Sequence, residues 1–492
     1  MNLREQILAR AAKGANLVLI GGGSASLIVL AYLLYYYGWT GRRHFATPTG
    51  VGWYFVLPIA IFAVLLISLR FKPSYRITAA VLSLVLTTSM YGVELYLNAL
   101  EHARFRPDKA LLALEGESTE VKQQAAKIAK QFGVDVDTRD SIEVIEEFAK
   151  QGVEAVPQII LPIFDQQIDD GVKAAIHINS VEVMPLSGIS DKMTVVCNQN
   201  GDYLTYRSDE HGFHNPRGSW PSSNLELAAV GNSFTMGYCV PSDKNYVALM
   251  KERYPGVLNL GMPGEGPLHI LAMLKEYLEP LQPKRVLWFY FEGNNLAELQ
   301  HEKRSPLLMR YMQDGFSQGL MGRQGEIDHA LSAYVKIQQA KKVSEPHNRP
   351  HSALARMRDI VKLTGLRMQL GMVYGRSTAE METVSEANVS LFHDILGRAK
   401  QRVGAWGGQI YFIYLPGWDR YVRAGPGIGG QQRAQILSRV NSLGLSLVDV
   451  LPAFAAQADP LSLFPFQRSG HYNEKGHRLV ANEVLKSISS GR

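Results

Sequence analysis

Three long apolar runs open the chain, and polar connections separate them. The runs cover residues 16–37, 52–69 and 77–100. Each has roughly the 20 apolar residues that a helix needs to cross a bilayer. Tyrosine and tryptophan gather where the first two runs meet their connection, as in the aromatic belts of membrane proteins. The pattern predicts a membrane anchor of three transmembrane helices over residues 1–100, and three buried core helices are the alternative.

Basic residues beside these runs indicate their orientation. The N-terminal tail and the second connection carry Arg4, Arg10, Lys13, Arg70, Lys72 and Arg76, whereas the opposite side carries Arg42, Arg43, Arg104, Arg106 and Lys109. This small excess predicts a cytoplasmic N-terminus, so three spans place the C-terminal domain in the periplasm of a multi-pass inner-membrane protein. Glu94, near the end of the third run, is expected to reach the membrane interface as a snorkelling carboxylate.

Residues 101–220 have a mixed pattern of short elements. Helical periodicity at their start leads into a short amphipathic helix over about 142–150. Apolar stretches at 194–197 and 203–206 follow, and they are typical of strands. We predict a small α+β connecting module that packs against the next domain.

From residue 221 onward, short continuous apolar runs alternate with helical segments. The five runs are 227–230, 257–260, 286–291, 410–415 and 445–450. Strands that are apolar on both sides are typical of a parallel sheet covered by helices on both faces. We therefore predict a doubly wound α/β domain over residues 221–492, with its functional residues at the carboxyl ends of the strands.

A helix-rich insertion, about 297–408, separates the third run from the fourth. It is too long for an ordinary crossover connection. We interpret it either as a helical cap over the functional site or as a structural addition to the domain.

Composition narrows the functional classes. The 492 residues are 46% hydrophobic and 20% charged, which excludes a disordered chain. The net charge of +6 is spread thinly, and no basic tract or motif indicates a nucleic-acid partner. The histidines, among them His211, His214, His269 and His301, lack metal-ligand spacing, so no metal is expected. The glycine-rich segment 259–266 lacks the spacing of a dinucleotide fingerprint, and no organic cofactor is expected.

The two cysteines, Cys197 and Cys239, lie far apart without a CxxC pattern, which argues against a zinc or redox motif. We interpret them as free buried thiols. A disulfide is the alternative, and an extracytoplasmic location permits it.

Four motifs follow predicted strands or precede a predicted helix. Ser233 lies in Val-Gly-Asn-Ser-Phe-Thr, at a strand-to-helix turn where backbone N–H groups face a developing oxyanion. Gly264 lies in a glycine-rich strand end, and Asn294 in Phe-Glu-Gly-Asn-Asn offers an amide donor. His471 precedes a terminal helix that Asn473 is suited to cap, so its imidazole can reach a serine as a base. Each motif alone also fits an ordinary turn or cap.

In their order and placement, the four motifs resemble those of the SGNH (GDSL-like) hydrolase superfamily, over about residues 225–490. The resemblance implies that Ser233 is the nucleophile and His471 the general base. It also implies an oxyanion hole formed by the backbone N–H groups of Ser233 and Gly264 and by the Asn294 amide. The segment 206–215 resembles a stretch that precedes the serine in some bacterial members.

The sequence departs from the family pattern at two positions. Asn232 stands where the family usually has aspartate, and Arg468 stands where an aspartate often precedes the histidine by three residues. Three interpretations remain open: a Ser–His dyad oriented by a backbone carbonyl, an orienting acid supplied by Asp449 or Asp459, or an impaired site. We favour the dyad.

The resemblance implies a membrane-anchored serine ester hydrolase or O-acyltransferase that removes or adds acetyl groups on cell-surface or exported polysaccharide through an acyl-serine. Expected partners are an acylated carbohydrate or other ester substrate, the lipid bilayer and proteins of a membrane complex. A lipase or thioesterase on lipid and a non-catalytic scaffold are the alternatives. Trp288, Tyr290, Trp418 and Tyr421 could stack on sugar rings, but we interpret them as core residues.

Overall fold

The computed structural model describes residues 3–35, 55–103, 126–127, 130, 135–160, 167–168, 171–172, 176–179, 181–220, 225–344, 357, 360–363, 366–367, 386–422, 429–467 and 470–489. The chain forms two compact units. One comprises Met1–Phe105 with Pro350–Ala379, and the other comprises Arg106–Arg349 with Glu380–Arg492.

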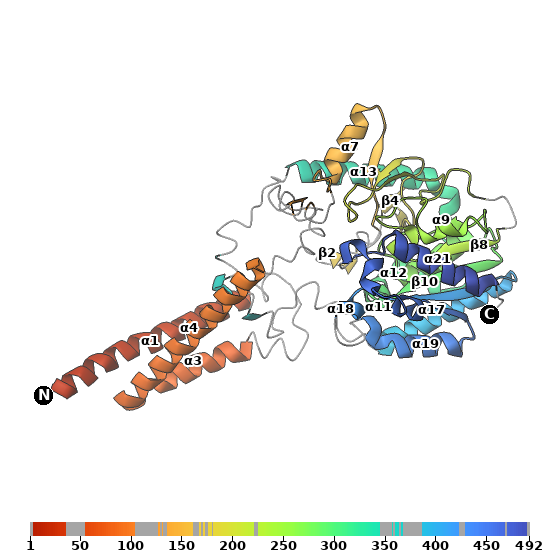
Figure 1. The fold of residues 1–492 in the computed structure, drawn as a ribbon. Coiled ribbons are helices and arrows are strands. Elements are labelled where there is room, and N and C mark those ends of the chain that lie inside the picture. Colours follow the sequence, from red (N-terminus) through yellow and green to blue (C-terminus); the bar gives the residue numbers. More distant parts are fainter. Residues whose placement is uncertain are drawn as a thin grey trace. The chain divides into compact units, whose positions relative to one another are not determined.

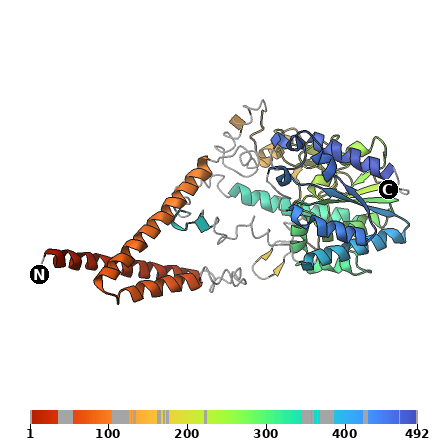
Figure 2. The ribbon, with the colours of Figure 1, turned by 60° about the horizontal axis from the view of Figure 1, so that its bottom comes forward.

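The first unit is built on three helices that pack against one another: α1 (Leu3–Leu34), α3 (Leu57–Ser68) and α4 (Pro73–Ala103) (Figure 1, Figure 2). Leu3–Leu34 and Pro73–Leu97 are long and apolar enough to cross a membrane. Helix α3 has 12 residues, fewer than a spanning helix needs. The expected three spans are thus corrected to two candidate spans and one short apolar helix, because the second apolar run forms too few helical turns among the described residues.

The long helices expose most of their apolar side chains. Leu17 is 73% exposed and Ile28 69% exposed on α1, and Leu82 is 63% exposed on α4. Glu94 differs, because it is 1% exposed and accepts a hydrogen bond of 2.7 Å from the backbone N–H of Leu366. The expectation that Glu94 snorkels to an interface is therefore wrong: its carboxylate is covered by the chain and receives a backbone donor.

The second unit contains a five-stranded, wholly parallel sheet, and all five predicted strands are confirmed. In chain order they are β8 (Leu227–Val230), β9 (Leu258–Asn259), β10 (Arg285–Phe291), β11 (Gln409–Leu415) and β12 (Ser446–Asp449). Their order across the sheet is β12-β11-β10-β8-β9. The chain leaves β8 for one edge and returns to its other side, so a topological switch point lies at the carboxyl end of β8.

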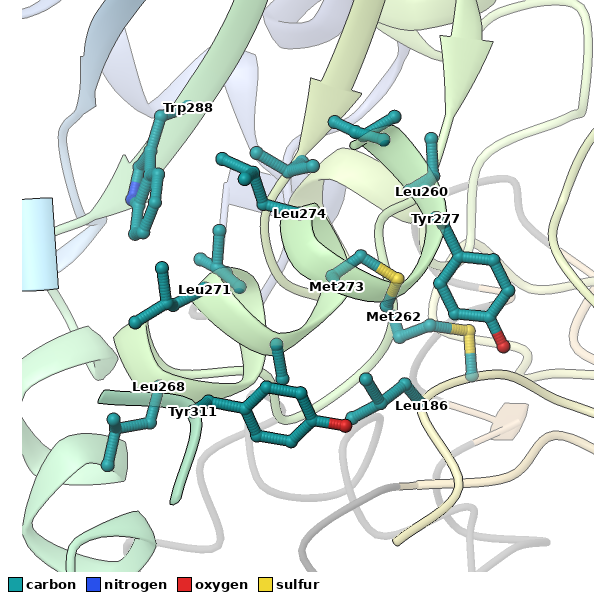
Figure 3. Close-up of a cluster of buried hydrophobic side chains, with 14 of the residues drawn as sticks. Leu186, Leu260, Met262, Leu268, Leu271, Met273, Leu274, Tyr277, Trp288 and Tyr311 are labelled. Atoms are coloured by element: carbon teal, nitrogen blue, oxygen red, sulfur yellow. The ribbon is translucent and has the colours of Figure 1, made fainter. Parts of the chain in front are cut away.

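Alternate side chains of each strand point to opposite faces, and both faces are buried. On β10, Trp288 and Tyr290 belong to one apolar cluster, whereas Leu287 and Phe289 belong to the other. Figure 3 draws part of the first cluster, with Trp288 facing the helix that carries Leu271 and Leu274. Trp288 and Tyr290 are therefore core residues, as we interpreted them.

Helices cover both faces of the sheet. The first cluster includes side chains of α10 (Pro267–Met273), α17 (Glu386–Ala405) and α19 (Arg433–Ser442). The second includes side chains of α9 (Tyr246–Met250), α20 (Leu451–Ala455) and α21 (Glu474–Ser489). This arrangement confirms the predicted α/β class with a parallel sheet.

The connecting region shares its core with the sheet. It holds α7 (Ser141–Lys150) and a small sheet of β1 (Ala155–Pro157), β6 (Met193–Val195) and β7 (Thr205–Arg207). Two-stranded pairs join β2 (Gln167–Ile168) to β3 (Gly171–Val172) and β4 (Ile176–Ile178) to β5 (Val181–Val183). Leu186 is buried in the same cluster as Trp288 (Figure 3). The predicted boundaries at residues 100 and 220 stay a prediction.

Side chains from the described part of the insertion also contribute to the hydrophobic core. Its elements include α11 (Asn295–Glu302), α12 (Pro306–Met309), η5 (Arg310–Met312), η6 (Leu320–Arg323) and α13 (Gln324–Ser344). Leu308, Ile327 and Phe392 are fully buried in the first cluster. Pro350–Ala379 belongs to the other unit. These observations favour the structural interpretation of the insertion over the cap.

Candidate active site

Ser233 lies at the turn between β8 and the short helix α8 (Ser233–Met236). Gly231 precedes it, and a Cβ there would lie 2.3 Å from Thr235 Oγ1, so only glycine fits. Asn232 caps the helix, because its side chain accepts a hydrogen bond of 3.1 Å from the Phe234 N–H. Ser233 is 8% exposed. The turn thus presents one hydroxyl at the switch point of the sheet.

His471 comes from the loop before α21 and meets this hydroxyl. Its Nε2 lies 2.8 Å from Ser233 Oγ. The loop is fixed on its C-terminal side by Asn473, whose side chain accepts from the N–H groups of Lys475 and Gly476 and so caps α21 as predicted. Tyr472, fully buried, donates to the carbonyl of Pro416 at 2.6 Å. The structure therefore brings together the two residues that the sequence paired across 238 positions.

The other nitrogen of His471 also has a partner. Nδ1 lies 3.0 Å from Oε1 of Gln199, a residue of the connecting region. With Nδ1–H donating to this oxygen, the Nε2 lone pair faces Ser233, which is the tautomer that a general base requires. Sequence reasoning missed Gln199, because no motif surrounds it and 272 positions separate it from His471.

Neither candidate orienting acid lies at His471. Asp449 pairs with Arg433 and accepts from the N–H of Leu451. Asp459 accepts from the N–H of Leu461 at 3.1 Å and from Gln467 Nε2 at 3.0 Å. Arg468 lies outside the described residues.

Asn294 follows β10 and lies beside the serine turn. Its Oδ1 accepts a hydrogen bond of 3.0 Å from Asn232 Nδ2. Asn294 is partly exposed, and no described residue accepts from its Nδ2. The neighbouring Asn295 is fully buried and has both ends of its amide occupied, by the Phe291 N–H and the Glu265 carbonyl. Of the two asparagines, Asn294 is thus the one whose amide can donate to a ligand.

Gly264 lies in the turn after β9, with φ of +81°, a conformation that favours glycine. Two hydrogen bonds connect this turn to the loops that carry Ser233 and Asn294. The N–H of Met262 donates to the Gly231 carbonyl at 3.1 Å, and Asn295 donates to Glu265 at 3.1 Å. The loops carrying Ser233, Gly264 and Asn294 therefore form one connected edge of the sheet.

Aromatic rings surround the imidazole of His471. The ring centres of Phe234 and Tyr238 lie 4.7 and 4.8 Å from that of His471. Burial lowers the pKa of His471 to about 4, because a charged imidazole loses its water there. At neutral pH the imidazole is therefore uncharged and able to accept a proton.

Cys197 and Cys239 form a disulfide, with their Cα atoms 5.5 Å apart. The interpretation as free thiols is wrong. Cys197 follows β6 and Cys239 follows α8, so the bond ties the connecting region to the helix that begins with Ser233.

The segment 206–215 forms hydrogen bonds with elements next to the site. Asp209 is fully buried and accepts hydrogen bonds from the N–H groups of His211 and Phe213 and from the side chains of Asn215 and Trp220. Asn215 in turn bonds both the N–H and the carbonyl of Asn259 on β9. This segment thus supports the sheet edge at β9, and its His214 Nδ1 lies 3.0 Å from the Met236 carbonyl on α8.

Comparison with known proteins gave matches to solved structures alone. No family model matches the chain, and no curated protein matches it. The chain is similar to a lipase/acylhydrolase from Enterococcus faecalis, with 14% identity and a TM-score of 0.30 over 54% of this chain and 96% of that one. It is similar to a member of the lipolytic protein G-D-S-L family from Veillonella parvula, with 14% identity and a TM-score of 0.28 over 53% and 97%. An acetyl xylan esterase is similar at 11% identity and a TM-score of 0.29, over 54% and 100%. Each of these three matches spans about half of this chain and nearly the whole of the solved structure.

Proposed function

We propose that the chain is a membrane-anchored serine ester hydrolase that cleaves acyl esters through an acyl-serine on Ser233. The hydrogen bond of 2.8 Å between Ser233 Oγ and His471 Nε2 carries this proposal. An alcohol is a weak nucleophile at neutral pH, and an uncharged imidazole within hydrogen-bond reach activates it by taking its proton.

In the proposed reaction, Ser233 Oγ attacks the acyl carbon while its proton passes to His471 Nε2. The oxyanion accepts hydrogen bonds from the N–H groups of Ser233 and Gly264 and from Asn294 Nδ2. The C–O bond to the alcohol then breaks, and the leaving oxygen takes the proton from His471. Water attacks the acyl-serine in the same way and releases the acid, whereas a second alcohol in place of water gives acyl transfer. One side-chain oxyanion donor contributes roughly 10²–10³-fold to such a reaction.

The substrate class that we propose is an O-acylated carbohydrate, as the sequence resemblance implies. A long-chain lipid ester is the competing substrate. Matched esters separate the two: acetate release from acetylated xylan or glucan supports the carbohydrate, and release of long-chain fatty acid from phospholipid supports the lipid.

Two features support a membrane location for this activity. Helices α1 and α4 are apolar along lengths that cross a bilayer, and their side chains face outward, unlike those of core helices. The disulfide between Cys197 and Cys239 supports an oxidising compartment, and we place the C-terminal domain on the periplasmic side on this ground alone. With two spans in place of three, the N-terminus would lie on the same side as this domain, so the orientation expected from the basic residues does not support this placement. Extraction of membranes with alkaline carbonate tests the anchor: the full chain is expected in the pellet, and recovery in the supernatant would contradict it.

A direct test uses the full chain in detergent and p-nitrophenyl acetate. Ser233→Ala and His471→Ala are each expected to lower kcat by at least a thousandfold, because the pair acts as one unit. Ser442→Ala is the matched control, since Ser442 Oγ lies 3.4 Å from His393 Nε2 on the surface, where the pair has no role in the proposed reaction.

A fluorophosphonate probe completes the test. We expect it to label wild type at Ser233, which peptide mass spectrometry can locate. A folded wild-type chain that neither labels nor hydrolyses esters would favour the non-catalytic scaffold.

A further inference from the structure

The residue that contacts His471 Nδ1 lies at the tip of a hairpin. Strands β6 and β7 pair in antiparallel fashion, and the N–H of Leu204 donates to the Cys197 carbonyl at 2.7 Å. The N–H of Gly201 donates to the Asn198 carbonyl at 2.9 Å and closes the tip. Gln199 is held inside this turn, and its side chain reaches the imidazole.

Two bonds attach the hairpin tip to Cys239, in the loop that follows α8. Cys197, two residues before Gln199, forms the disulfide with Cys239. Asn200, one residue after Gln199, donates from Nδ2 to the Cys239 carbonyl. Cys239 itself comes directly after Tyr238, whose N–H donates to the Ser233 carbonyl at 3.0 Å. Gln199 is thus fixed on both sides to the segment that follows the nucleophile.

Two further hydrogen bonds join the tip to Asp137. Asn198 Nδ2 donates to the Asp137 carbonyl at 2.9 Å, and the Asp137 N–H donates to the Gly201 carbonyl at 2.7 Å. A side chain whose backbone is held by four such bonds loses little further entropy when it binds the imidazole.

We propose that Gln199 is a positioning residue that completes the site as a neutral third member, and that the Cys197–Cys239 disulfide holds it against His471. The inference rests on the proposed function of Ser233 and His471. Gln199 Oε1 accepts from Nδ1–H, fixes the tautomer and directs Nε2 to the hydroxyl. It therefore does the orienting work that a carboxylate does in a Ser-His-Asp triad, without adding a charge.

The absence of charge on Gln199 has a measurable consequence. A carboxylate beside an imidazole raises its pKa, whereas an amide does not. Among the described residues, two titratable side chains near His471 are Tyr238, from the loop after α8, and His477, from α21. His477 accepts from the Tyr246 N–H through Nδ1, and burial lowers its pKa to about 3, so it stays uncharged beside His471.

Three variants of the full chain test the positioning role with the same ester assay. Gln199→Ala removes the acceptor, and kcat is expected to fall about tenfold with KM nearly unchanged, as for loss of one hydrogen bond that serves the transition state. Gln199→Glu keeps an acceptor but adds a charge, so the acid limb of kcat/KM is expected to move to higher pH by about one pH unit or more. Gln151→Ala is the matched control, because Gln151 is exposed in the same region.

The pH profile separates positioning from mere support of the fold. If Gln199 served only to pack the fold and did not contact the imidazole, the acid limb of kcat/KM would stay at the same pH in Gln199→Glu. An acid limb equal to that of wild type, or a Gln199→Ala variant with wild-type kcat, would overturn the proposal. Ser233→Ala is run beside these variants: if it too retains activity, the proposed function itself has failed.

A double-mutant cycle tests the disulfide. The pair Cys197→Ser with Cys239→Ser is expected to lower kcat because the tip that carries Gln199 loses one attachment. In the Gln199→Ala background the two cysteine substitutions should change kcat little, because the contact between Gln199 and His471 that the disulfide preserves is already absent. Equal losses in both backgrounds would show that the disulfide acts on the site by another route, and circular dichroism of each variant identifies any that fails to fold.

Discussion

Asn232 donates a hydrogen bond from Nδ2 to Oδ1 of Asn294 across a distance of 3.0 Å. The direction of this bond follows from a second one. The Phe234 N–H must meet an acceptor, so the atom of Asn232 facing it is Oδ1, and the atom facing Asn294 is Nδ2. Asn294 therefore turns its oxygen to Asn232 and its Nδ2 outward. The residue before the serine thus orients a proposed oxyanion donor while it caps the helix.

The first prediction concerns this pair of asparagines. Asn232→Ser keeps a side-chain acceptor for the Phe234 N–H but cannot reach Asn294. We expect kcat to fall about tenfold in Asn232→Ser and roughly a hundredfold in Asn294→Ala. The double variant should resemble Asn294→Ala, because Asn232 acts through Asn294. Steady-state kinetics on p-nitrophenyl acetate measure all three, and additive losses would mean that the two residues act separately.

The strands of this fold could be predicted from the sequence because they are buried on both faces. Runs such as 286–291 and 410–415 are apolar without a break, and few other structures need that pattern. Parallel order then fixes the edge at which Ser233, Gly264 and Asn294 must lie. The pattern of apolar runs and the parallel order of the strands thus suffice to predict that these residues lie at one edge of the sheet.

Contacts between distant segments could not be predicted in the same way. Gln199 meets His471 through a hairpin tip, and nothing in the neighbouring residues marks it as part of a site. Asp449 and Asp459 are near His471 in sequence, but the carboxylate of Asp449 pairs with Arg433 and that of Asp459 accepts from the N–H of Leu461 in a local turn. Whether Cys197 and Cys239 form a disulfide likewise depends on tertiary structure, because their spacing in the sequence fits free thiols and a disulfide equally well.

The second prediction follows from the pKa of His471, which burial lowers to about 4. A general base works only while it is uncharged, so activity is lost as the pH falls through this pKa. We expect kcat/KM to stay level from neutral pH down to roughly pH 5, where a site with an ordinary histidine pKa of about 6.5 would have lost about thirtyfold in kcat/KM. A pH series with an ester that does not titrate measures this, with circular dichroism at each pH as the control for unfolding. An acid limb near the ordinary value would contradict the prediction.

The third prediction concerns Glu265, which is fully buried beside Gly264. Neither of its carboxylate oxygens has a hydrogen-bond partner among the described residues. Burial, and then the charge of Glu302, raises its pKa well above the usual range. The pKa of Glu265 is higher in the folded chain than in the unfolded chain. The protonated carboxyl therefore stabilises the fold at low pH, and this stabilisation is lost as the pH rises through the pKa of the folded chain.

Glu265→Gln is neutral at every pH, and so it removes this dependence. We expect its Tm to exceed that of wild type at pH 8 and the difference to shrink toward pH 4. Glu252→Gln, at an exposed position, is the matched control and should change Tm little at either pH. A difference in Tm that is the same at both pH values would mean that Glu265 does not titrate as described.

The last prediction concerns the stability that the disulfide provides. It closes a separation of 42 residues between Cys197 and Cys239, and a loop of that length corresponds to about 4 kcal/mol from the lower entropy of the unfolded chain. Dithiothreitol supplies the two electrons and two protons that convert the bond to two thiols. We therefore expect wild type to unfold at a lower urea concentration with dithiothreitol than without it. The variant with Cys197→Ser and Cys239→Ser should unfold at that lower concentration under both conditions, because it has no bond to reduce. A wild-type midpoint that does not respond to the reductant, while free-thiol titration reports two new thiols in the native state, would show that the bond constrains little of the unfolded chain.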